Sequence, residues 1–183
     1  MNSIIIGLGN PGEKFENTPH NIGFEVLDTF AEKNHFPEFV LEKKLEAEIA
    51  KKGNIILAKP VTFMNHSGKA AKKLSLFYKS KNIILVHDDK DLAIGYIKIV
   101  CNRGSAGHKG VESVIKAVGN KNLTRIRIGI ASQKKVEAMK IILKEFSKAQ
   151  NLLVKKSIKK SNDALLCIIE KGVPKAMNEY NKN

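Results

Sequence analysis

Apolar and polar positions follow two different periods along this chain, and the two periods alternate from one segment to the next. Short apolar or strictly alternating runs are typical of β-strands, and they occur at residues 3–8, 46–51, 54–59, 82–87, 96–100 and 125–130. Longer stretches with a 3.6-residue period predict helices at residues 22–33, 68–78, 111–118, 136–147 and 152–171. Strands that alternate with helices indicate an α/β fold.

Local turn signals refine this pattern. Gly53-Asn54 stands between two of the predicted strands and is typical of a hairpin turn, so we expect these two strands to pair antiparallel. Gly119 follows an apolar repeat at the position of a helix C-cap glycine. We therefore predict a single α/β domain over residues 1–183, with a mixed, twisted β-sheet flanked by helices.

The composition excludes several classes of protein. With 183 residues and 43% hydrophobic residues, the chain is predicted to be globular with a substantial core. No apolar run approaches the ~20 residues of a membrane helix, and no signal peptide is evident. Cys101 and Cys167 do not form a C-x-x-C motif, so a reduced, cytoplasmic setting is expected.

The net charge changes the picture most. Lys and Arg total 32 against 18 for Asp and Glu, which gives +14 at pH 7. Such an excess favours polyanionic partners, RNA above all. Because nearly all of the excess is lysine, the alternative is a surface whose lysines serve only solvation.

A glycine-rich turn, residues 7–12, follows the first apolar run. Its spacing matches G-x-G-x-x-G, which raises the alternative of a dinucleotide-binding oxidoreductase. In that fold a helix starts within the turn, whereas here Pro11 and Pro19 interrupt any helix before Asn21. We therefore favour a turn that brings polar side chains to a substrate.

Four predicted loops at strand ends, at residues 7–23, 59–68, 87–92 and 103–110, are rich in polar residues. The carboxyl ends of strands in an α/β sheet converge on one crevice, where His20 and an Asp could meet. Histidine is suited to act as a general base near neutral pH, with the Asp holding its other nitrogen. Asparagine amides could then stabilise an oxyanion, and we expect Asn10 and Asn65 to do so. Alternatively, Asn65 or Ser67 caps the next helix.

Two further clusters leave alternatives open. Asp88, Asp89 and His108 could bind a metal, although no pair of ligands has a diagnostic zinc spacing, and we expect no metal or cofactor. Arg125 and Arg127 alternate with isoleucines, so they are expected on one face of a strand. They form either a phosphate-binding surface or a solvated strand face.

Together these segments resemble the bacterial-type peptidyl-tRNA hydrolase family over about the first 130 residues. The motifs that carry the resemblance are Gly7-Leu-Gly-Asn-Pro-Gly12, Thr18-Pro-His-Asn21, Lys59-Pro-Val-Thr-Phe-Met-Asn-His-Ser-Gly68, His87-Asp-Asp-Lys-Asp-Leu92, Gly104-Ser-Ala-Gly-His-Lys-Gly110 and Arg125-Ile-Arg-Ile-Gly129. The resemblance implies a cytoplasmic, metal-free monomer that hydrolyses the ester between a peptide and the 3′ end of tRNA.

The resemblance also implies roles for single residues. His20 would be the general base, oriented by Asp88. The substrate-binding residues would be Asn10, Phe15, Met64, Asn65, His108 and Lys109. The tRNA phosphate would be bound by Lys98 and Arg127, with Arg103 supplying a further cation.

The chain departs from the family pattern at three positions. Pro19 replaces the usual Arg before the catalytic His, and Val100 replaces a basic residue. Lys109 replaces an Asn, and lysine donates hydrogen bonds but cannot accept them. A non-catalytic RNA-binding protein is therefore a second hypothesis, and a metal-dependent hydrolase that uses Asp88, Asp89 and His108 is a third.

Overall fold

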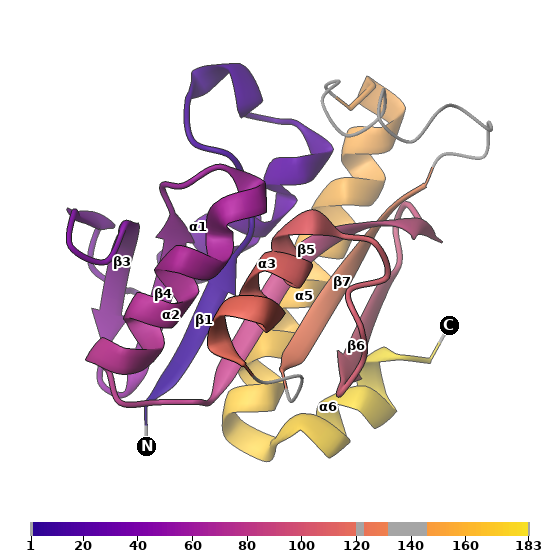
Figure 1. Ribbon diagram of the computed structural model, residues 1–183. Helices are drawn as coiled ribbons and strands as arrows, with labels where there is room; N and C mark the ends of the chain where they lie inside the picture. Colours follow the sequence, from indigo (N-terminus) through magenta and orange to yellow (C-terminus); the bar gives the residue numbers. More distant parts are fainter. Residues whose placement is uncertain (1, 120–122, 132–145, 183) are drawn as a thin grey trace.

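The computed structural model describes residues 2–119, 123–131 and 146–182, and it has helices on both faces of a seven-stranded sheet (Figure 1). The strands are β1 (Ser3–Gly7), β2 (Val40–Glu42), β3 (Ala47–Lys52), β4 (Ile55–Pro60), β5 (Ile83–Ala93), β6 (Ile97–Cys101) and β7 (Thr124–Ala131). The helices are α1 (Ile22–Lys33), α2 (Ser67–Phe77), α3 (Lys109–Val118), α5 (Lys148–Lys171) and α6 (Val173–Tyr180). Three short 3₁₀ helices, η1 (Glu13–Phe15), η2 (Pro19–Asn21) and η3 (Met64–His66), lie in the loops.

The sheet is mixed, and its strand order is β2-β3-β4-β1-β5-β7-β6. β1 pairs in parallel with β4 and β5, and β5 pairs in parallel with β7. β3 and β4 form the predicted antiparallel hairpin, in which Gly53 adopts a φ of 56°. β6 is an antiparallel edge strand against β7. The predicted α/β fold with a mixed sheet and flanking helices is confirmed.

Alternating side chains of β1 separate the core into two layers. Ile5 packs with α1 and α5 on one face, whereas Ile4 and Ile6 pack with α2 and α3 on the other. All three isoleucines are fully buried, because a parallel strand in the middle of the sheet is covered on both sides. In Figure 1, α2 and α3 lie in front of the sheet and α5 lies behind it.

Several boundaries differ from the sequence prediction. Residues 87–92 were expected to form a loop, but β5 continues to Ala93, because Asp88 and Asp89 still pair with β7. β2 and α6 were not predicted; all three residues of β2 are exposed, so that strand leaves no burial pattern. The helix predicted at residues 136–147 falls almost wholly outside the described residues.

A helix that spans a bilayer needs about 20 predominantly apolar residues, and this requirement applies to every helix of the described ranges. None of them is long and apolar enough to cross a membrane.

Candidate active site

A cleft of about 610 Å³ opens at the carboxyl ends of β1, β4 and β5. The loops after these strands converge there, as expected for the parallel part of an α/β sheet. Its lining includes every residue predicted to act in catalysis or to bind the substrate: Asn10, Phe15, His20, Met64, Asn65, Asp88, His108 and Lys109. Arg127 also lines the cleft, whereas Lys98 and Arg103 do not.

The glycine turn brings the first loop over the cleft. Gly7 lies directly against the backbone of Gly23, so neither position has room for a side chain, and α1 packs closely on the end of β1. Asn21 then binds both backbone groups of Asn10: Oδ1 accepts from the Asn10 N–H at 2.8 Å, and Nδ2 donates to the Asn10 carbonyl at 3.0 Å. The sequence prediction missed this role, although Asn21 follows His20 within the same motif.

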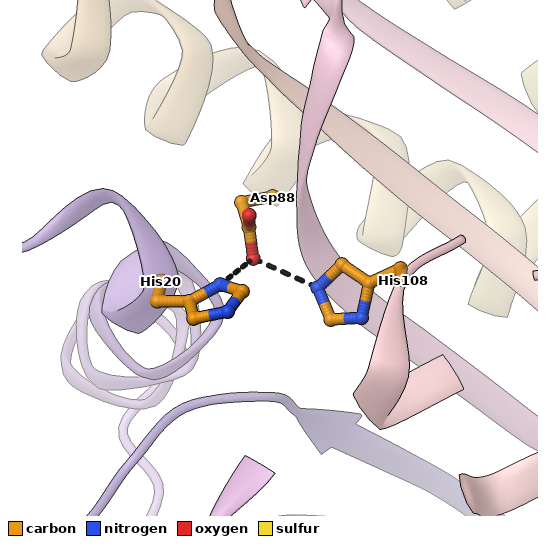
Figure 2. A group of neighbouring side chains, drawn as sticks. All are labelled: His20, Asp88 and His108. Carbon is orange, nitrogen blue, oxygen red and sulfur yellow. Dashed lines mark hydrogen bonds and ion pairs between the residues drawn. The ribbon is translucent and has the colours of Figure 1, made fainter. Parts of the chain in front are cut away.

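His20, Asp88 and His108 form one hydrogen-bonded group (Figure 2). Nδ1 of His20 lies 2.7 Å from Oδ1 of Asp88, and Nε2 of His108 lies 2.9 Å from the same oxygen. A carboxylate only accepts hydrogen bonds, so Nδ1 of His20 and Nε2 of His108 each carry a proton. In neutral His20, the basic nitrogen is therefore Nε2.

His108 has its tautomer fixed from both sides. The backbone N–H of Val111 donates to Nδ1 at 3.3 Å, which makes Nδ1 the acceptor and Nε2 the donor to Asp88. His108 also serves as the N-cap of α3. The resemblance placed His108 among the residues that bind the substrate in the cleft. In the structure His108 lines the cleft and also donates a hydrogen bond to Asp88.

The two histidines keep Asp88 ionised. Burial raises the pKa of this carboxyl, but the hydrogen bonds from His108 and His20 outweigh burial and hold the pKa well below its usual range. Asp88 is 2% exposed, so little water competes for its charge. The fixed negative charge of Asp88 stabilises the imidazolium that forms when His20 takes up a proton.

The three side chains also bring one potential metal ligand each within 4.8 Å of the others. A tetrahedral zinc with bonds of about 2.0–2.2 Å would hold its ligand atoms roughly 3.3 Å apart or more. The nitrogen–oxygen distances of 2.7 and 2.9 Å are shorter, and they fit direct hydrogen bonds. Asp89, the other acid of the metal hypothesis, forms an ion pair with Arg127 instead.

The two asparagines differ in how they are held. Oδ1 of Asn10 accepts from the backbone N–H of Met64 at 2.8 Å, so Nδ2 is the group left for a substrate. Asn65 is exposed, and its nearest side-chain partner is His66 at 3.4 Å. The prediction that Asn65 or Ser67 caps α2 was wrong, since Ser67 Oγ donates to the Met64 carbonyl and no side chain caps this helix.

An apolar wall faces these polar groups. The rings of Phe15 and Phe63 meet edge to face with centroids 6.4 Å apart, and Met64 is buried beside them. Lys14 Nζ lies 4.9 Å from the centre of the Phe15 ring. The cleft therefore has an apolar side next to the hydrogen-bonded group.

The predicted phosphate-binding cations occupy neighbouring strands. Lys98 on β6 is exposed and lies directly opposite Arg127 on β7. Arg127 forms an ion pair through Nε with Asp89. Arg103 is exposed in the loop before α3. Arg125 was expected on the same open strand face, but it is buried, because the Arg103–Gly104 backbone covers it.

Sequence reasoning brought residues 87–92 to the crevice but gave His87 and Lys90 no role there; both line the cleft, as does Asp89. His87 is buried, and its Nδ1–H donates to the Asp88 carbonyl at 2.7 Å. Burial lowers the pKa of His87 well below its usual value, and His108 adds to this effect, so His87 is neutral. The sequence signal for a role of His87 was that a polar residue follows an otherwise apolar strand.

Comparisons with known proteins agree with one another. A family model described as Peptidyl-tRNA hydrolase matches residues 4–183, well beyond the first 130 residues in which the resemblance was found. The peptidyl-tRNA hydrolase of Thermodesulfovibrio yellowstonii is 39% identical over 191 residues, covering 98% of each chain. That of Aquifex aeolicus is 40% identical, covering 98% of this chain and 96% of the relative. A crystal structure of peptidyl-tRNA hydrolase from Acinetobacter baumannii matches with a TM-score of 0.90 at 28% identity, covering 98% of this chain and 94% of that one.

Proposed function

This chain belongs to the peptidyl-tRNA hydrolase family, and we propose that His20 is the base that activates water in its active site. The enzyme hydrolyses peptidyl-tRNA at the ester between the peptide and the 3′ end of tRNA. The products are a peptide with a free carboxylate and a tRNA that can be charged again.

The bond between His20 Nδ1 and Asp88 carries the proposal. It leaves Nε2 of His20 unprotonated, so Nε2 takes a proton from water as the water oxygen attacks the ester carbonyl. Asp88 stabilises the imidazolium that forms. When the tetrahedral intermediate collapses, the bond to the ribose oxygen breaks and Nε2 returns the proton to that oxygen.

Two amide groups are placed to stabilise the oxyanion. Asn10 offers Nδ2, because its Oδ1 is held by Met64, and Asn65 lines the same cleft. General-base help contributes typically ~10²–10⁴-fold, and one oxyanion donor a further ~10²–10³-fold. The ribose oxygen leaves as a hydroxyl once Nε2 returns its proton, so a general base and oxyanion donors are the groups that this reaction calls for.

The tRNA-binding part of the proposal rests on charge and register. Lys98 and Arg127 stand opposite each other on adjacent strands, and the chain carries +14 overall. We propose that they bind a tRNA phosphate, with Arg103 nearby, since cations on rigid strands fix the position of a backbone. We also propose a cytoplasmic monomer that acts as one domain over residues 1–183 without metal or cofactor.

The direct test is release of tRNA from an N-acetylaminoacyl-tRNA, measured with and without a chelator and beside His20→Ala. Chelator-resistant release that is lost in the variant supports the metal-free His20 mechanism. Release that a chelator abolishes would instead favour a metal held by His20, Asp88 and His108. Tight tRNA binding without release would favour the RNA-binding hypothesis.

A further inference from the structure

Arg125 lies beneath one wall of the cleft, and no step of the reaction above uses it. Its side chain is 2% exposed, whereas arginine is almost never fully buried unless it is paired. Ile126, the next residue on β7, packs into the layer that contains α1 and α5. Side chains alternate along a strand, so Arg125 faces the opposite side of the sheet, where α3 lies.

The guanidinium of Arg125 is bonded to the backbone of one loop. Nη2 donates to the carbonyl of Gly104 at 2.8 Å and to the carbonyl of Arg103 at 3.3 Å. Burial, and then the charge of Arg127, lower the pKa of Arg125, but arginine keeps its proton in proteins. Two carbonyl groups of the loop therefore converge on one buried cation.

One residue of this loop has a backbone conformation that its type does not favour. Ala106 has a φ of 51°, in the left-handed region that residues other than glycine rarely adopt, whereas Asn102 (φ 54°) and Gly107 (φ 78°) are of types that adopt it more readily. Residues 105–109 nevertheless form one wall of the cleft. His108, near the end of the wall, must reach Asp88 to donate its hydrogen bond. Contacts from outside the loop therefore have to stabilise its backbone conformation.

We infer that Arg125 is a positioning residue, whose guanidinium holds residues 103–108 in place so that His108 and Lys109 stand in the cleft. The inference rests on the proposed function of the cleft, and it removes Arg125 from the surface that binds RNA. Both hydrogen bonds come from Nη2 of a rigid, planar guanidinium, and lysine at this position would keep the charge but place a single flexible ammonium there. Arg125→Lys is therefore the variant that separates the geometry of the guanidinium from its charge.

We expect Arg125→Lys to lower kcat/KM for N-acetylaminoacyl-tRNA by between about 10- and 100-fold, the effect of a roughly 1 Å misplacement. Measured in an Arg103→Ala background, the Kd for uncharged tRNA and its salt dependence stay unchanged on Arg125→Lys, because Arg125 itself bonds only to backbone carbonyls of the loop. Amide hydrogen exchange in residues 105–109 becomes faster. In the double variant Arg125→Lys/His108→Ala, the two losses are not multiplicative, since Arg125 acts through the loop that carries His108.

Ile126→Val is the matched control, because it shortens the adjacent, fully buried side chain on the other face of β7. An equal loss of kcat/KM in Ile126→Val at an equal fall in Tm would overturn the inference, and so would multiplicative losses in the double variant. In the Arg103→Ala background, a further weakening of the tRNA Kd with a shallower salt dependence would show that Arg125 contacts RNA. If the wild-type enzyme released no tRNA, the proposed function would fail, while hydrogen exchange would still decide whether Arg125 orders the loop.

Discussion

His20, Asp88 and His108 are linked by two hydrogen bonds to one carboxylate oxygen, and little of them is exposed. Lys98 and Arg103, by contrast, are exposed and form no ion pair within the described parts of the chain. Of the two groups, only the first lines the cleft and is held in a fixed geometry.

The difference follows from what each group has to do. Proton transfer requires a donor and an acceptor within hydrogen-bond reach, so the side chains must be fixed before the substrate arrives. A phosphate is bound largely by charge, so an exposed cation on a strand satisfies that requirement without a hydrogen-bond partner inside the protein. Changes in the hydrogen-bonded group should therefore act on kcat, and changes among the cations should act on tRNA binding.

The largest effect is expected for His20→Ala. Removal of the base should lower kcat by at least ~10²–10⁴-fold, because water is then no longer deprotonated in the transition state. The Kd for tRNA should remain within about twofold, since His20 lies among partners that bind no phosphate. Single-turnover release and filter binding measure the two quantities, and an equal loss of affinity would contradict a role on water alone.

Asp88→Asn should lower kcat by on the order of 10³-fold. The amide keeps the shape of the side chain and an oxygen that can still accept both N–H groups, but it carries no charge to stabilise protonated His20. Single-turnover rates of the wild type and of Asp88→Asn at saturating enzyme measure this loss of kcat. Unchanged kcat would leave the ion pair without a catalytic role.

The lowered pKa of Asp88 also makes the free energy of unfolding depend on pH. Its pKa is held below the ordinary value of 3.8, so the unfolded chain takes up this proton first as the pH falls. The stabilisation is fully present above about pH 3.8 and is lost as the pH falls through the lower pKa of the folded state. Urea unfolding from pH 6 to pH 2.5 should therefore show a steeper loss for the wild type than for Asp88→Asn.

Arg127→Ala tests whether the cations on the strands bind a tRNA phosphate. The variant should weaken tRNA binding and reduce the log–log salt slope by ~0.7–0.9, the contribution of one phosphate. kcat at saturating substrate should change little. Because Asp89 would lose its ion-pair partner, Asp89→Asn/Arg127→Ala is the variant that separates phosphate binding from an unpaired buried acid. An unchanged salt slope in both variants would exclude Arg127 from phosphate binding.

The smallest effect is expected for Lys109→Asn. Lys109 is exposed at the start of α3 and forms no ion pair with the residues that the structure describes. An asparagine restores an amide that both donates and accepts, so we expect activity that is unchanged or a few-fold higher. A loss of kcat/KM above tenfold would show that Lys109 has acquired its own contact with the substrate.

The sequence by itself determined the α/β class, the hairpin at Gly53 and the bounds of α1, because each depends on local periodicity or turn chemistry. It also offered His20 and Asn10 as candidates, since polar residues beside apolar strands stand out from their surroundings, while the family resemblance singled out Asp88. The family motifs that carry these residues are local in the chain as well. Short-range patterns therefore established both the fold class and the main candidates for chemistry.

Tertiary structure decided which partners those residues have. The extension of β5 to Ala93 depends on pairing with β7, and acidic residues give no such signal in one dimension. Arg125 and Arg127 share one strand and one face, yet one is buried and the other lines the cleft, because the loop at Gly104 covers only the first. Contacts between segments far apart in the chain depend on packing and loop course, and no local pattern records them.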